Sequence, residues 1–96
     1  MTSNRSQGAF GFDASLNWKL SPEVAIRPEQ FGALAYHYGN RRLVFLKSKD
    51  LVQLVHDLSD FDSAEAAIAA TIAPTKQQSY VAALARLAQS EVLVVS

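Results

Sequence analysis

Few side chains in this sequence could support catalysis or bind a metal ion. The two histidines, His37 and His56, stand outside any recognisable metal-ligand pattern, and the chain has no cysteine. No serine lies in a nucleophile elbow beside a suitably placed base. We therefore expect no catalytic residue and no metal site.

A cluster of acidic residues in the middle of the chain first suggests calcium: Asp57, Asp60, Asp62 and Glu65. These residues lack the Asp-x-Asp-x-Asp-Gly order of an EF-hand loop, and helix ends and caps explain them better. The four glycines fit neither the dinucleotide fingerprint nor the phosphate-binding loop. We expect no cofactor.

The overall charge argues against nucleic acid as a partner. Nine Lys and Arg balance nine Asp and Glu, so the basic excess of a nucleic-acid-binding protein is missing. No segment is apolar enough to be a secretory signal or a membrane span. Together with the absence of cysteine, this predicts a cytoplasmic protein that does not enter the membrane.

The zero net charge conceals an uneven distribution along the chain. Residues 1–49 hold seven basic and three acidic residues, whereas residues 50–96 hold two basic and six acidic residues. The basic residues Arg41, Arg42, Lys47 and Lys49 lie close together. They could protect an exposed strand edge from aggregation, or they could attract an acidic partner.

The chain length allows one domain with a single core. Residues 1–15 show no hydrophobic period and are expected to form a flexible arm, so the domain would span residues 16–96. Short extended segments are predicted at 17–20 and 24–27.

A β-hairpin is the clearest local prediction. Residues 33–38 and 41–46 are β-prone and are separated by Gly39-Asn40, which is typical of a two-residue turn. This turn pairs Tyr38 with Arg41, Tyr36 with Leu43 and Leu34 with Phe45. Because both faces of the second strand are largely apolar, we expect each face to be at least partly covered.

Three helices are predicted after the hairpin. Leu51, Leu54, Val55 and Leu58 recur at helical spacing after a Ser48 cap. Asp62 and Glu65 have capping-box spacing before a helix that reaches Ile72, and Thr75 and Gln78 have it before a third helix. The segment 92–95 is either a short strand or a buried tail.

These elements predict an α+β fold, in which a three-stranded antiparallel meander is followed by three helices in a winged-helix-turn-helix-like layout. In such a layout the third helix often reads DNA. Here only Lys76 and Arg86 are basic between residues 75 and 90, which disfavours that role.

Two motifs carry a family resemblance: Arg27-Pro28-Glu29-x-Phe31-Gly32-Ala33 and Gly39-Asn40-Arg41-Arg42-Leu43-x-Phe45-Leu46-Lys47. With these motifs, residues 16–95 resemble the peptide chaperones of the mycofactocin system, within the wider PqqD-like family of precursor-peptide recognition domains. The chain departs from the PqqD-like pattern at Lys47, where Asn is frequent, and at Ser59-Asp60, which replaces a usual Gly.

The resemblance implies a non-catalytic chaperone that binds a ribosomally made precursor peptide and presents it to a radical S-adenosylmethionine maturase, which modifies the precursor's C-terminal Val-Tyr. In such domains the peptide adds as a strand in the groove between the third strand and the third helix. The implied peptide-binding residues are Arg41, Arg42, Leu43, Val44, Phe45, Leu46, Lys47, Tyr80, Val81, Leu84, Ala85 and Ala88. A Val44→Pro substitution is then expected to weaken peptide binding, because Pro removes a backbone donor.

Two other classes of function stay open at this point. One is a small winged-helix nucleic-acid-binding domain. The other is a dimerisation module, in which an open sheet edge or the segment 92–95 pairs with a second copy, and a homodimer would also be compatible with peptide binding.

Overall fold

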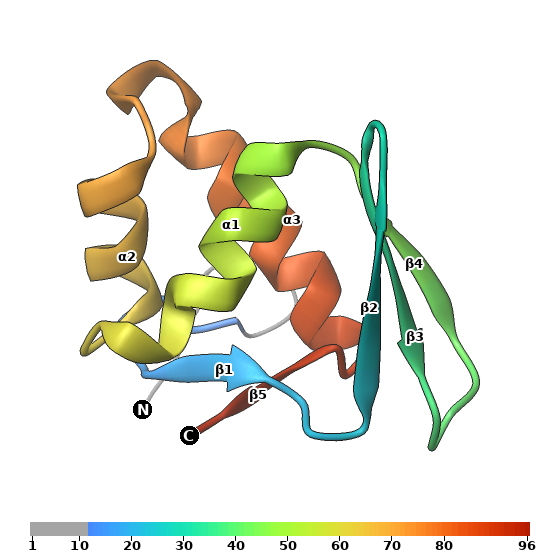
Figure 1. Ribbon diagram of the computed structural model, residues 1–96. Coiled ribbons are helices and arrows are strands. Elements are labelled where there is room, and N and C mark those ends of the chain that lie inside the picture. The colour runs from blue at the N-terminus through green and yellow to red at the C-terminus, as the bar shows by residue number, and fades with distance from the viewer. Residues whose placement is uncertain (1–11) are drawn as a thin grey trace.

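The computed structural model describes residues 12–96, and it has the predicted α+β architecture (Figure 1). Strands β2 (Val24–Glu29), β3 (Gly32–His37) and β4 (Leu43–Leu46) form an antiparallel sheet in the order β2-β3-β4. Helices α1 (Lys49–Asp57), α2 (Ala64–Thr71) and α3 (Gln77–Gln89) follow, with short 3₁₀ turns η2 (Leu58–Asp60) and η3 (Pro74–Lys76) between them.

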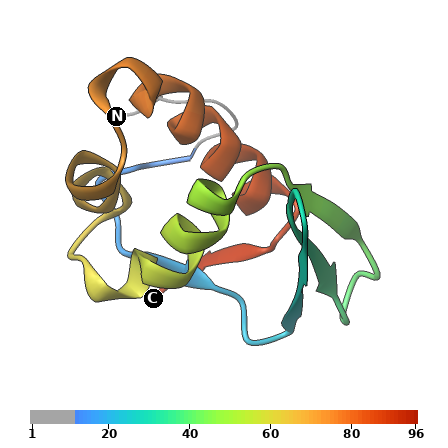
Figure 2. The ribbon, with the colours of Figure 1, turned by 45° about the horizontal axis from the view of Figure 1, so that its top comes forward.

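A second, two-stranded sheet closes the domain. Strand β1 (Trp18–Leu20) pairs antiparallel with β5 (Leu93–Val95), with Trp18 opposite Val95 (Figure 2). The C-terminal segment is therefore a strand. The pairing with β1 occupies one edge of β5. Strand β1 therefore lies outside the three-stranded sheet.

The core begins before residue 16. Phe12 is buried and lies with its ring centroid 4.8 Å from that of Trp18. The backbone oxygen of Ala14 accepts a hydrogen bond from the Glu65 N–H at 2.8 Å, which joins this segment to the start of α2. The predicted arm otherwise lies outside the described residues, up to residue 11.

The register of the β3–β4 hairpin is confirmed, but the predicted turn is wrong. Leu34 lies opposite Phe45 and Tyr36 opposite Leu43. Tyr38, however, donates its N–H to Glu23 across the sheet and does not pair with Arg41.

The loop of this hairpin has four residues, 38–41, between His37 and Arg42. The His37 N–H donates to the Arg42 oxygen at 3.0 Å, and Arg41 adopts a left-handed conformation with φ 64°. The buried His37 imidazole accepts the N–H groups of Gly39 and Asn40 at Nδ1, at 3.0 and 3.1 Å. These side-chain contacts stabilise a wider turn than local sequence preference predicts.

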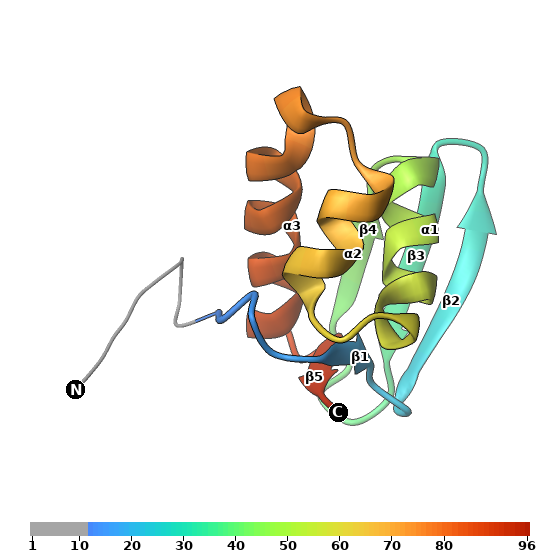
Figure 3. The ribbon, with the colours of Figure 1, turned by 90° about the vertical axis from the view of Figure 1, so that its left-hand side faces the viewer.

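The two faces of the three-stranded sheet differ sharply. Its inner face packs against the helices, where Ala33, Ala35 and Leu46 are fully buried (Figure 3). On its outer face Tyr36, Leu43 and Phe45 are 37%, 58% and 56% exposed. The expectation that each face is at least partly covered holds for the inner face, whereas within residues 12–96 large side chains of the outer face are exposed.

The helix caps only partly match their predictions. Ser48 caps α1 as predicted, because its Oγ accepts the Leu51 N–H at 3.0 Å. Ser63, and not Asp62, caps α2 by accepting the Ala66 N–H at 3.0 Å. Lys76 precedes α3 without a side-chain cap, so the predicted Thr75 box does not form.

Leucines from four elements meet in the core: Leu46, Leu54, Leu84 and Leu93 are almost completely buried. This shared core fixes α1 and α3 against the inner face of the sheet. Among the described residues, no helix is sufficiently long and apolar to cross a membrane.

Candidate functional site

Strand β4 has one unpaired edge within the described residues. It pairs with β3 alone, and the alternation of antiparallel pairs decides which of its backbone groups face that edge. The His37 N–H donates to the Arg42 oxygen, so the backbone groups of Arg42 that face β3 recur two residues later at Val44, which lies opposite Ala35. The N–H and C=O groups of Leu43 and Phe45 must then point away from β3, toward the open edge.

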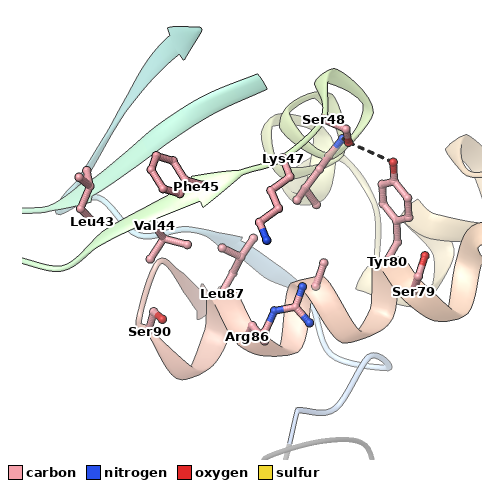
Figure 4. Close-up of a pocket in the computed structure, with 12 residues that line it drawn as sticks. Leu43, Val44, Phe45, Lys47, Ser48, Ser79, Tyr80, Arg86, Leu87 and Ser90 are labelled. Atoms are coloured by element: carbon pink, nitrogen blue, oxygen red, sulfur yellow. Dashed lines mark hydrogen bonds between the residues drawn. The ribbon is translucent and has the colours of Figure 1, made fainter. Parts of the chain in front are cut away.

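A groove of about 450 Å³ lies between this edge and α3 (Figure 4). Its strand wall consists of Leu43, Val44, Phe45 and Lys47. Its helix wall consists of Ser79, Tyr80, Ala83, Arg86, Leu87 and Ser90, and Ser48 and Leu51 contribute from the start of α1.

Hydrogen bonds connect the two walls at both ends of the groove. At one end the Ser48 Oγ lies 3.1 Å from the Tyr80 hydroxyl oxygen. Near the other end, the Asn40 side-chain amide donates to the Ser90 backbone oxygen at 3.1 Å. These contacts hold the strand and the helix at a defined separation, so the groove is preformed.

The groove carries positive charge on both walls. Lys47 extends from the strand side and Arg86 from the helix side, and both are exposed (Figure 4). Within residues 12–96 neither forms an ion pair, and the residues lining the groove include no carboxylate. The groove is therefore suited to an extended ligand that has apolar side chains and at least one acidic group.

The strand side contains most of the residues that the sequence predicts for it. Leu43, Val44, Phe45 and Lys47 line the groove, whereas Leu46 points into the core. Arg41 and Arg42 are exposed in and beside the hairpin loop, just before β4 begins. The N–H of Val44 faces β3, so a Pro at this position would break the sheet rather than report on its open edge.

The helix side differs from its prediction. Tyr80 lines the groove, but Leu84 and Ala85 are buried in the core. Val81 lines a second hollow with Ala14 and Ile68, and the half-buried Ala88 is likewise absent from the groove wall.

Five residues of the helix wall were not predicted for the site, and they occupy one helical face: Ser79, Ala83, Arg86, Leu87 and Ser90. Their spacing of three to four residues is the available signal. The predicted positions lie on the most apolar stripe of α3, which faces the core, and not on the mixed stripe beside it.

Elsewhere in the described residues, the side chains of His37 and Asp57 make hydrogen bonds within the fold. Asp57 accepts hydrogen bonds from the Gln53 side chain at 3.0 and 3.1 Å. Within residues 12–96, no three His, Asp or Glu side chains gather in a way that could hold a metal ion.

Comparison with known proteins identifies the family of this chain. Residues 17–94 match the model of the peptide chaperone MftB family. The chain is 46% identical over 84 residues to the peptide chaperone MftB of Mycolicibacterium smegmatis, covering 86% of this chain and 82% of that protein. It is 44% identical over 84 residues to the peptide chaperone MftB of Mycobacterium tuberculosis, covering 86% of this chain and 77% of that protein. No solved structure matches, and on the extent of these sequence matches the chain belongs to the peptide chaperone MftB family.

Proposed function

We propose that this protein binds a ribosomally made precursor peptide in the groove between β4 and α3, and presents it to a radical S-adenosylmethionine maturase in mycofactocin biosynthesis. Membership of a family of peptide chaperones supports this role, and it also supports a role without catalysis. The observation that carries the proposal is the unpaired edge of β4 beside a preformed groove. The proposal places this activity in the cytoplasm.

The peptide would bind as an additional strand next to β4. Leu43 and Phe45 offer two backbone donors and two acceptors to it. Four hydrogen bonds at about 0.5–1.5 kcal/mol each contribute about 2–6 kcal/mol, whereas association costs about 4–15 kcal/mol. Backbone pairing alone is therefore too weak.

Burial of peptide side chains in the groove supplies the remaining free energy. Each apolar side chain contributes about 1.5–3 kcal/mol when it is fully buried. Val44 and Ala83, which are half-buried in the groove wall, provide apolar surface for them. An acidic side chain of the peptide would lie near Lys47 and Arg86, while Arg41 and Arg42 would mainly increase the rate of encounter.

The proposed contact residues are thus revised from those that the resemblance implies. They are Leu43, Val44, Phe45, Lys47, Ser79, Tyr80, Ala83, Arg86 and Leu87. Leu46, Leu84 and Ala85 support the groove from the core, and Val81 and Ala88 stand apart from it.

Titration of the ¹⁵N-labelled protein with the precursor peptide tests the proposal. We expect amide shifts to concentrate at 43–47 and 79–90. A scrambled peptide of the same composition is the control. Absent shifts, or shifts centred on α2, would contradict the proposal.

A pair of neighbouring substitutions on α3 sharpens this test. Ala83 is half-buried in the groove wall, and the adjacent Ala82 is exposed outside it. Ala83→Arg should fill the groove and lower peptide affinity about ten-fold or more, since it displaces at least one buried side chain. Ala82→Arg adds the same charge and should leave peptide affinity almost unchanged.

A further inference from the structure

The outer face of the three-stranded sheet is an exposed apolar strip that meets the peptide groove at Leu43 and Phe45. Cross-strand partners Tyr36 with Leu43 and Leu34 with Phe45 share this face. Phe31 and Tyr38, 50% and 60% exposed, extend it at its two ends. We call these six residues the outer strip. In Figures 1 and 2 the described helices lie on the other face of the β2-β3-β4 sheet.

The aromatic rings of the outer strip are organised in pairs. Phe31 lies edge-to-face with Phe45 at a centroid distance of 5.9 Å. Tyr36 and Tyr38 form a second edge-to-face pair at 5.5 Å. Large exposed apolar patches rich in aromatic side chains are typical of protein interfaces, because such side chains bury much area with little loss of conformational entropy.

We propose that the outer strip is the docking surface for the maturase, a folded protein that presents an apolar patch bordered by acidic side chains. This inference rests on the proposed function, since it concerns the enzyme that receives the bound peptide. It adds a second surface to the protein, which extends beyond the groove and shares Leu43 and Phe45 with it.

Continuity with the groove favours this partner. Leu43 and Phe45 belong to both surfaces: their side chains form part of the outer strip, and they also line the groove. A peptide strand added beside β4 would project alternate side chains onto the outer face, next to these two residues. A protein docked on the outer strip would therefore contact the chaperone and the peptide together.

Charge disfavours a second copy of this chain on the same surface. Arg41, Arg42 and Lys47 are exposed along the β4 side of this sheet, whereas Arg27 on β2 forms an ion pair with Glu29 at 3.1 Å. A symmetric pair that brings the two β4 sides together would place these basic residues next to each other, and like charges across an interface oppose association. A partner with acidic side chains around its apolar patch would instead be attracted to these basic residues.

Separate binding measurements for peptide and maturase test the inference on the full chain. The double variant Leu34→Thr with Tyr36→Thr removes apolar area from the outer strip, keeps β-prone residues and leaves the groove lining intact. We expect maturase affinity to fall about ten-fold or more, as for the loss of interface anchors, while peptide affinity changes less than about two-fold. Ala83→Arg should instead reduce peptide affinity and leave the affinity for the maturase without peptide unchanged.

Saturating peptide should also increase the affinity of the wild-type protein for the maturase, and the maturase should increase peptide affinity by the same factor.

If the double variant does not fold, as judged by circular dichroism, the single variant Tyr36→Lys makes the same test with less change to the sheet. Unchanged maturase affinity in the folded outer-strip variant would overturn the inference. An effect of that variant on self-association alone would also overturn it, as would a maturase affinity that does not respond to peptide. A third contrary result would be that removal of residues 1–11 increases the exposure of Tyr36, because these residues would then cover the strip. Loss of peptide binding in the outer-strip variant, or retention of it in Ala83→Arg, would instead count against the proposed groove.

Discussion

The hydroxyl oxygens of Ser48 and Tyr80 lie 3.1 Å apart and connect the start of α1 to α3 at one end of the groove. Ser48 also accepts the Leu51 N–H at 3.0 Å, so one side chain both caps α1 and contacts the opposite wall. The conformation of the chain just after β4 is thereby coupled to the position of α3.

Replacement of Ser48 should destabilise the protein more than removal of the Tyr80 hydroxyl. Ser48→Ala loses the cap and the contact, and should lower the free energy of unfolding by about 1–2 kcal/mol. Tyr80→Phe, the matched control, loses only the contact, and should cost about 0.5–1 kcal/mol. Urea denaturation measures both, and equal losses would contradict the dual role of Ser48.

A proline at position 45 should weaken peptide binding without unfolding the protein. The Phe45 N–H faces the open edge of β4, where Pro is tolerated, but an added strand would lose one donor. Loss of one hydrogen bond worth about 0.5–1.5 kcal/mol predicts a peptide affinity about two- to ten-fold lower. Isothermal titration calorimetry measures this effect.

Two comparisons isolate the backbone contribution at Phe45. Phe45→Ala removes the side chain and keeps the N–H, so its difference from Phe45→Pro reports the donor. Val44→Pro should destabilise the sheet itself, because Val44 pairs with Ala35. If Val44→Pro is stably folded and Phe45→Pro is not, the assigned edge orientation is wrong.

Asn40 should control the opening of the groove near the C-terminal end of α3. Its side-chain oxygen accepts the Arg42 N–H at 2.9 Å, and its amide donates to the Ser90 oxygen. Asn40→Ala should lower the free energy of unfolding by about 1–2 kcal/mol and increase hydrogen exchange at the Arg42 amide.

Asn40→Asp is the matched control for this change. It retains an acceptor for the Arg42 N–H but no longer donates to Ser90. Protection of the Arg42 amide should therefore persist in Asn40→Asp, whereas both variants should bind peptide less tightly. Identical exchange behaviour in the two variants would contradict separate roles for the oxygen and the nitrogen.

Reversal of charge at Arg86 should reduce affinity for an acidic peptide. Arg86 lines the groove, so Arg86→Glu replaces attraction by repulsion, and we expect a loss of about three- to ten-fold at low salt, which shrinks as ionic strength rises. Lys76→Glu makes the same change of net charge outside the groove. A similar loss in both variants would indicate long-range attraction rather than a local contact.

Gly32 should not tolerate a side chain. A Cβ at this position would collide with the Leu46 carbonyl oxygen and lie 3.0 Å from the Ser48 backbone nitrogen. Gly32→Ala should therefore lower the free energy of unfolding by about 1–3 kcal/mol, because backbone at the end of β4 would have to move. Gln30→Ala, in the same turn, should have little effect, and thermal unfolding of the two variants makes the comparison.

Local patterns in the sequence determined much of the fold. The positions of the hairpin strands fixed the pairing of Leu34 with Phe45, since a shift by one residue would exchange the two faces of the sheet. The Ser48 cap and the apolar period after it located α1. These features depend on neighbours in the chain, so the sequence alone can specify them.

Tertiary packing decided the features that depend on distant segments. The neighbouring residues in the sequence do not distinguish the groove-facing Ala83 from the core-facing Ala85. Both side chains are equally small, so the packing of α1 and the sheet decides how α3 is rotated about its own axis. In the same way, the partner of β1 is β5, which lies at the other end of the chain, so the sequence around β1 does not specify this pairing. The exposed outer strip also became apparent only in three dimensions, since apolar alternation shows that two faces exist but not which of them the helices cover.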